Sequence, residues 1–237
     1  STSLDIGSLY NDEASTITSL TNDSTGIMQG TKSNRSGIVN EGTISTLTNS
    51  GTIKGTGGTL SYGLYNTGTI NSLTNDSAGI ISSKQSKGLY NAGTITTLTN
   101  SGTIKGTGVT NSEGLYNSGT ITLLTNDLGA VISSNKTHGL YNTATINRLY
   151  NEGTIFSTSG YGLYNTSSNT IVDLENTGTI SSSSSHAIVN TGRITDINNT
   201  LTISGAGGKY DDINNNNGTI TNLYNNQGAA TSDPLTL

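Results

Sequence analysis

Short alternations of apolar and polar residues recur along this chain at a nearly constant interval. The clearest unit, Gly-Leu-Tyr-Asn or a close relative, ends at Asn11, Asn40, Asn66, Asn91, Asn117, Asn142, Asn165 and Asn190. From Asn40 onward these asparagines are 26, 25, 26, 25, 23 and 25 residues apart. A repeat of this length is typical of solenoid folds, in which each repeat stacks on its neighbours.

Each period contains three segments with the alternation of a β-strand. In one clear period they are residues 88–91 (GLYN), 93–100 (GTITTLTN) and 102–106 (GTIKG). No segment shows helical spacing, and each is bounded by Gly, Asn or Ser. The pattern predicts an all-β chain that folds as a single-stranded parallel β-helix, with three short strands per coil of about 25 residues and about nine coils. The general preference for right-handed parallel crossovers predicts a right-handed helix.

A second repeat lies on top of the first. Residues 41–91 and 92–142 are near-copies offset by 51 residues, and eleven consecutive residues are identical at Leu47–Gly57 and Leu98–Gly108. This similarity indicates duplication of a two-coil unit. Copies this alike favour a role in stacking over a unique catalytic pocket.

Strand alternation assigns directions to the side chains. Leu and Ile are expected to point inward in columns, with about five or six apolar residues buried per coil. The columns are Leu64, Leu89, Leu115, Leu140 and Leu163, and Ile44, Ile70, Ile95, Ile121 and Ile146. The repeated asparagines are expected at corners, with left-handed backbone and with amides that bond the coils above and below.

The repeat predicts one solenoid over residues 1–226. The chain is less regular from Thr200 onward, with loops expected at 205–209 and 214–217 and a last strand at 218–225. Residues 227–237 are expected to form either a C-terminal cap or a disordered tail.

Composition supports a thin core and excludes several functions. Only 30% of the residues are hydrophobic and 11% are charged, which suits a core built coil by coil. The absence of Cys excludes disulfides and thiolate metal sites, and no cofactor or metal is expected. The net charge of −5 and the scattered basic residues disfavour nucleic-acid partners. No apolar run approaches the roughly 18 residues of a membrane helix, so we expect no membrane insertion by this segment.

A row of tyrosines is the most informative outward feature. Five occupy the same motif position and should form one exposed ladder: Tyr65, Tyr90, Tyr116, Tyr141 and Tyr164. One interpretation is a rigid aromatic strip that contacts a glycan or a protein partner. The other is that stacked tyrosines only stabilise neighbouring coils.

Threonines of the Gly-Thr-Ile motifs form further files along the coils. Regular threonine files resemble those of ice-binding solenoids, which carry paired T-x-T rows. Here Thr94/Thr96 and Thr120/Thr122 keep the pair, whereas Ser45, Asn71 and Asn147 interrupt it. Ice binding is therefore only a minor alternative.

No catalytic constellation is evident, and we predict that the chain is not an enzyme. The 15 acidic residues are dispersed, and His138 and His186 lack a matched acid and nucleophile pattern. Arg148, Asp173 and Asp196 fall at one motif position on successive coils, which predicts a surface charge ladder of little energetic weight.

The units resemble a known family. Tandem repeats such as Gly88–Gly106, with the sequence GLYNAGTITTLTNSGTIKG, resemble the passenger domains of bacterial type V autotransporter adhesins, the self-associating group that includes the Antigen 43 and diffuse-adherence types. The resemblance covers roughly residues 7–226. It implies a right-handed β-helix that is exported through the outer membrane to the cell surface, in some members glycosylated on Ser or Thr. Because the motifs identify the coil and not a ligand, no binding residue carries over.

These observations favour a cell-surface adhesin segment that mediates adhesion, autoaggregation or biofilm formation through its extended polar face. Its partners would be copies of itself on neighbouring cells, or glycans or proteins of a host surface. The alternative is a carbohydrate-binding or carbohydrate-cleaving β-helix of the tailspike or lyase type.

Overall fold

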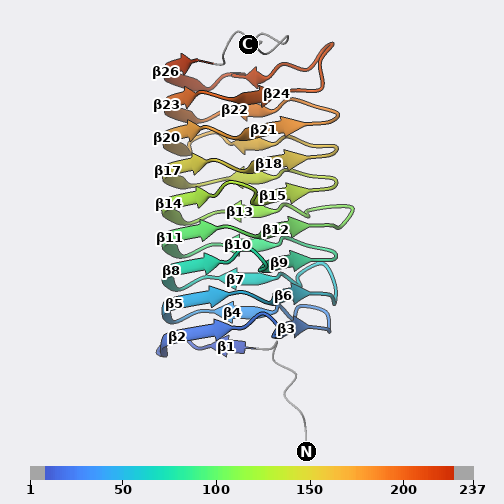
Figure 1. The fold of residues 1–237 in the computed structure, drawn as a ribbon, viewed down its shortest axis with the longest axis vertical. Helices are drawn as coiled ribbons and strands as arrows, with labels where there is room; N and C mark the ends of the chain where they lie inside the picture. The colour runs from blue at the N-terminus through green and yellow to red at the C-terminus, as the bar shows by residue number, and fades with distance from the viewer. Residues whose placement is uncertain (1–8, 227–237) are drawn as a thin grey trace, which may run out of the picture.

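The chain forms one parallel β-solenoid. The structure is a computed structural model that describes residues 9–226, and these contain 26 strands and no helix (Figure 1). The strands belong to three parallel sheets that run the length of the molecule, two of nine strands and one of eight. The predicted parallel β-helix with three strands per coil is thereby confirmed. The cap or tail expected at 227–237 lies outside the described residues.

We call the three sheets A, B and C. Each of the first eight coils contributes one strand to each sheet, and the last described coil contributes β25 and β26 to sheets A and B. Sheet A contains β1 (Leu9–Asn11), β4 (Ile38–Asn40), β7 (Leu64–Asn66), β10 (Leu89–Asn91), β13 (Leu115–Asn117), β16 (Leu140–Asn142), β19 (Leu163–Asn165), β22 (Ile188–Asn190) and β25 (Ile213–Asn214). Sheet B contains β2 (Thr16–Asn22), β5 (Thr43–Asn49), β8 (Thr69–Asn75), β11 (Thr94–Asn100), β14 (Thr120–Asn126), β17 (Thr145–Asn151), β20 (Thr170–Asn176), β23 (Arg193–Asn199) and β26 (Thr219–Asn225). Sheet C contains β3 (Ile27–Gly30), β6 (Thr52–Gly55), β9 (Ile80–Ser83), β12 (Thr103–Gly106), β15 (Val131–Ser134), β18 (Thr154–Ser157), β21 (Thr179–Ser182) and β24 (Thr202–Ser204).

The register keeps each motif position above its copy in the previous coil. In sheet A, Tyr90 pairs with Tyr65 on one side and with Tyr116 on the other. In sheet B, Ile95 pairs with Ile70 and Ile121 in the same way. A shift by one residue would turn every inward side chain outward, so the apolar columns hold this register.

The core is narrower than expected. A typical coil buries four large apolar side chains completely: Leu64 from sheet A, Ile70 and Leu73 from sheet B, and Ile81 from sheet C. The prediction of five or six apolar residues per coil is wrong, because asparagines occupy two further inward positions in each coil.

These asparagines form two buried ladders. In every rung the side-chain Nδ2 donates to Oδ1 of the asparagine one coil further on, at 2.7–2.9 Å. One ladder ends the strands of sheet A and runs from Asn11 to Asn190 and Asn215, and the other ends those of sheet B and runs from Asn22 to Asn225. Each amide also donates to a backbone carbonyl, as Asn91 does to Gly93 at 3.2 Å.

The expected hydrogen bonds between asparagine amides of successive coils are therefore confirmed, but the expected left-handed backbone conformation of these asparagines is wrong. Among the described residues other than glycine, a positive φ occurs only at Asn34, Asn111, Ser168 and Asn217, none of which is a ladder asparagine. From Asn11 to Asn190 and from Asn22 to Asn199, the ladder asparagines are the last residues of extended strands and are buried, so the reason for Asn is the pairing of a buried amide and not the conformation of a corner.

The connections from sheet C to sheet A carry the loops that project at one side of the molecule (Figure 1). They vary in length, whereas the turns between sheets A and B and between B and C are short. The predicted excursion at 205–209 is one of these loops, with positive φ at Gly207 and Gly208. No helix in the described part of the chain is suited to cross a membrane.

Candidate functional site

The five predicted tyrosines form one row on the outer face of sheet A. Each is the middle residue of its strand, between a buried Leu and a buried Asn, so strand alternation turns its ring outward. Consecutive ring centroids are 5.2, 4.8, 5.1 and 5.1 Å apart from Tyr65 to Tyr164. The rings are half-buried by one another, because one strand spacing is about the contact distance of two aromatic rings.

The packing within the row gives it a structural role. The ring planes of Tyr90 and Tyr116 meet at 85°, and those of Tyr116 and Tyr141 at 73°, which are edge-to-face arrangements. Such pairs contribute about 0.5–1.5 kcal/mol each beyond the area that they bury. A contact role for the same row stays a prediction.

A second column beside the row was missed by the sequence reasoning. It consists of the residue that precedes the first Gly or Ala of the six sheet A motifs from β7 to β22, where the loop from sheet C returns: Tyr62, Lys87, Glu113, His138, Tyr161 and His186. We call it the loop-base column. No single residue type fills this position, so no motif marks it, although its constant offset from the Gly-Leu-Tyr-Asn unit is visible in the sequence.

The loop-base column packs against the tyrosine row. The Tyr62 ring lies 5.1 Å from that of Tyr65 and 5.2 Å from that of Tyr90. His138 stacks on Tyr161 at 4.8 Å and meets Tyr141 at 5.1 Å. The tyrosine row and the aromatic residues of the loop-base column beside it together make what we call the aromatic strip.

Burial changes the titration of this strip. Desolvation raises the pKa of Tyr62 to about 12, and it also raises the pKa values of Tyr65 and Tyr141. Burial lowers the pKa of His138 to about 4, and its Nδ1 accepts a hydrogen bond from the Tyr161 backbone N–H at 3.1 Å. These groups are therefore neutral near pH 7.

One buried ion pair lies within the loop-base column, between its aromatic residues. Lys87 Nζ lies 3.6 Å from Glu113 Oε2, and the two side chains are 14% and 5% exposed. The same ammonium lies 5.2 Å from the ring centroid of Tyr116 and 6.0 Å from that of Tyr62. Glu113 Oε2 is buried and makes no hydrogen bond.

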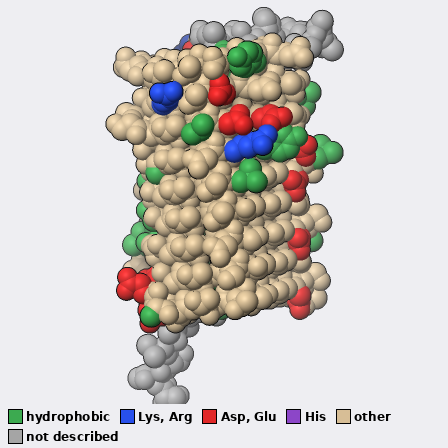
Figure 2. All heavy atoms as spheres, turned by 90° about the vertical axis from the view of Figure 1, so that its left-hand side faces the viewer, with side chains coloured by type: hydrophobic (Ala, Val, Ile, Leu, Met, Phe, Trp, Pro, Cys, Tyr) green, Lys and Arg blue, Asp and Glu red, His purple; other side chains and the backbone are tan. Residues whose placement is uncertain are grey.

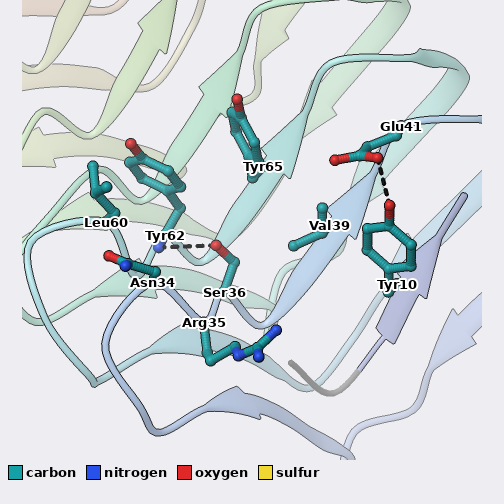
Figure 3. Close-up of a pocket in the computed structure, with 9 residues that line it drawn as sticks. All are labelled: Tyr10, Asn34, Arg35, Ser36, Val39, Glu41, Leu60, Tyr62 and Tyr65. Atoms are coloured by element: carbon teal, nitrogen blue, oxygen red, sulfur yellow. Dashed lines mark hydrogen bonds between the residues drawn. The ribbon is translucent and has the colours of Figure 1, made fainter. Parts of the chain in front are cut away.

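Two hollows open on this face and share Tyr62. One, of about 290 Å³, is lined by Tyr62, Lys87, Tyr90, Asn111, Glu113, Tyr116 and Tyr141. The other, of about 310 Å³, lies nearer the N-terminal end and is lined by Tyr10, Asn34, Arg35, Ser36, Val39, Glu41, Leu60, Tyr62 and Tyr65. Figure 3 shows Tyr62 and Tyr65 on one side of the second hollow and Tyr10 with Glu41 on the other.

Glu41 fixes the edge of the second hollow. The Tyr10 hydroxyl donates to Glu41 Oε2 at 2.5 Å, and this hydrogen bond, with some burial, raises the pKa of Tyr10 to about 12. Both hollows are at the small end of the range of ligand pockets, about 300–1,000 Å³.

The outer face of sheet B differs from that of sheet A. The first, third, fourth and sixth residues of each strand point outward, since the inward Ile and Leu are the second and fifth. In four successive strands these outward residues are all uncharged, and we call them the polar face: Thr43, Ser45, Thr46, Thr48, Thr69, Asn71, Ser72, Thr74, Thr94, Thr96, Thr97, Thr99, Thr120, Thr122, Leu123 and Thr125.

Charged side chains on this side lie in one cluster and along the margins. Figure 2 shows a basic side chain among acidic ones towards one end of the surface, and further acidic side chains along its right-hand edge and at its lower left. The register aligns Arg148 with Asp173 and Asp173 with Asp196, as predicted. Arg148 also reaches Glu175, with Nη2 2.9 Å from Oε2, a contact that the repeat position alone did not reveal.

Two acidic residues at the same motif position have structural partners in the adjacent coil. Asp76 and Asp127 each accept a hydrogen bond at 2.5 Å from a serine of the adjacent coil, Ser50 and Ser101 respectively. Within residues 9–226, no group of three or more His, Asp or Glu side chains is placed to hold a metal ion.

No protein-family model, no curated protein and no solved structure matches the chain.

Proposed function

We propose that this chain is a segment of a bacterial cell-surface adhesin, exported through the outer membrane, that mediates adhesion, autoaggregation or biofilm formation and is not an enzyme. The polar face is the surface through which it would act. Its partners would be copies of itself on neighbouring cells, or glycans and proteins of a host surface.

The observation that carries the proposal is the repetition of the polar face in register. Fifteen of its sixteen side chains are Thr, Ser or Asn, and the strands that carry them are aligned coil by coil. Each such group contributes little to binding when it acts alone. Linked along a rod, many weak contacts reinforce one another, because every contact after the first is effectively intramolecular.

The absence of charge on the polar face favours association with a second copy. A face with many like charges would repel its own copy, whereas hydroxyls and amides both donate and accept hydrogen bonds. Two copies of this face could therefore pair without a complementary partner of opposite charge.

Display of the chain on the surface of a non-aggregating bacterium tests the proposal. We expect displaying cells to settle faster than cells that carry an empty display scaffold, and to adhere to abiotic or host-cell surfaces. Cells that display the folded chain and neither clump nor adhere would contradict it.

Carbohydrate binding is the second candidate function. The aromatic strip on sheet A and its two hollows favour it, since ligand sites combine apolar or aromatic walls with a few placed polar groups. This surface belongs to a different sheet from the polar face, so the two functions are separable by mutation.

A further inference from the structure

We propose that the hollow around Lys87 and Glu113 is a binding site for a neutral linear oligosaccharide. The inference deepens the second candidate function and does not depend on self-association. Its site includes Tyr62, Tyr90, Tyr116 and Tyr141 as aromatic walls.

The hollow contains a buried carboxylate, that of Glu113. Glu113 is 4% exposed, it lines the hollow, and its Oε2 has only the Lys87 ammonium at 3.6 Å and no hydrogen bond. A buried charged oxygen without a hydrogen bond is costly, because desolvation is not repaid. As placed, this oxygen has almost no accessible surface, so the carboxylate must turn towards the hollow for a hydroxyl of a bound ligand to supply the missing donor.

The ion pair also defines the charge of the ligand. Lys87 and Glu113 neutralise one another, so the hollow offers no net charge to an acidic or basic ligand. The ammonium donates and the carboxylate accepts, and a sugar with adjacent hydroxyls can satisfy both at once. A neutral polyhydroxylated ligand therefore fits better than an ion.

The tyrosine row supplies the repeat that a linear glycan needs. Ring centroids follow one another at 5.2, 4.8 and 5.1 Å from Tyr65 to Tyr141. An extended β-1,4-linked hexose chain advances by about one strand spacing per sugar. The apolar faces of successive sugars can thus meet successive rings, whose hydroxyls remain available at the edge.

The site has room to extend. The second hollow shares Tyr62 and continues the strip to Tyr65 and Tyr10 (Figure 3). A glycan of several residues could run along the axis of the solenoid from one hollow to the other. Affinity is therefore expected to increase with the length of the chain, because each added sugar meets a further ring.

Isothermal titration calorimetry of the full chain with cellohexaose tests the site. We expect a Kd below about 1 mM and weaker binding of cellobiose. Glu113→Gln, which keeps the shape of the side chain, and Tyr116→Ala should each weaken binding at least about tenfold. Glu175→Gln on sheet B is the matched control and should bind as the unmodified chain does.

A second variant protects the test against loss of folding. Removal of the Glu113 charge leaves the Lys87 ammonium without its partner, which can lower stability. If E113Q has a lower melting temperature than the unmodified chain, the double variant K87M/E113Q, which leaves no unpaired charge, is used in its place. Failure of the unmodified chain to bind cellohexaose at about 10 mM would overturn the inference, as would unchanged affinity in Y116A and in the Glu113 variant.

Two further ligands test whether the site prefers a neutral saccharide to a charged ligand. Tetragalacturonate and choline are the acidic and cationic probes, and tighter binding of either than of cellohexaose would contradict a neutral saccharide. If the chain binds the glycan but its displaying cells do not clump, the binding site stands and the self-association proposal fails. If the displaying cells clump but the chain does not bind the glycan, self-association stands and the binding site fails.

Discussion

At the scale of single residues, the protein depends on buried amides. Asn100 accepts from Asn75 at 2.8 Å and donates to Asn126 at 2.8 Å, and its amide also lies within hydrogen-bond distance of the Gly102 and Val131 carbonyls. All of these groups lie inside the solenoid, where water cannot replace a lost partner.

Replacement of Asn100 by alanine should therefore be severe. It leaves several buried groups unpaired, and we expect the free energy of unfolding to fall by about 2–4 kcal/mol. Asn71→Ala, at an exposed position of β8, is the matched control and should change it by less than about 0.5 kcal/mol. Urea denaturation of both variants measures the difference. Equal stabilities of the two variants would show that the buried asparagine ladder contributes no more to stability than an exposed asparagine does.

His138 should make stability depend on pH. Its pKa is about 4 in the folded protein, below the ordinary value of 6.5, because burial disfavours the charged ring. As pH falls below 6.5 the unfolded chain takes up a proton that the folded chain does not, so stability is lost progressively down to pH 4. The loss is at most about 3 kcal/mol.

The variant His138→Tyr isolates this effect, since tyrosine occupies the same position at Tyr62 and Tyr161. Chemical denaturation at intervals from pH 7 to pH 4 should show the unmodified protein losing stability relative to H138Y below pH 6.5. If the free energy of unfolding of the two proteins changed with pH in the same way, His138 would not be the source of the loss of stability.

At the scale of strands, the charge ladder across β17 and β20 should matter little. The Arg148 side chain is 54% exposed, and the partners Asp173 and Glu175 are 39% and 28% exposed. Water screens such pairs, so Arg148→Ala should shift the melting temperature by no more than about 2 °C in calorimetry. A larger shift that disappears in high salt would show that the ladder stabilises the sheet.

Alternation along the strands is also what made the fold predictable. The inward Leu of Leu-Tyr-Asn and the inward Ile of Gly-Thr-Ile follow from a period of two, and the spacing of the motifs sets the coil. The asparagines were misplaced because a polar residue at the end of a strand is normally a turn residue. Only the stacked structure shows that each amide finds a partner one coil away.

The candidate site was predictable only in part. The tyrosine row follows from a repeated motif position, and the structure places all five tyrosines in one line. The Lys87–Glu113 pair could not be found in this way, because its residues lie at the ends of loops of different length and share no type. Their proximity arises from the stacking of coils and not from any local pattern.

At the scale of the whole molecule, the solenoid presents two different long surfaces. Sheet A carries the aromatic strip with its hollows, and sheet B carries the polar face. Because each coil contacts mainly its neighbours, surface changes on one sheet should leave the other intact. This separation allows the proposed adhesive role to be tested without disturbing the fold.

The most direct test is the settling of displaying cells after lysines are placed on the polar face. Asn71, Thr96 and Thr122 are exposed third residues of β8, β11 and β14, and the variant N71K/T96K/T122K makes like charges meet when two copies pair. The control S82K/S133K/S181K carries the same charge on sheet C, where Lys54 and Lys105 already occur at this position. We predict that clumping is lost in the sheet B variant and kept in the control, whereas equal clumping by both at equal display would contradict self-association through the polar face.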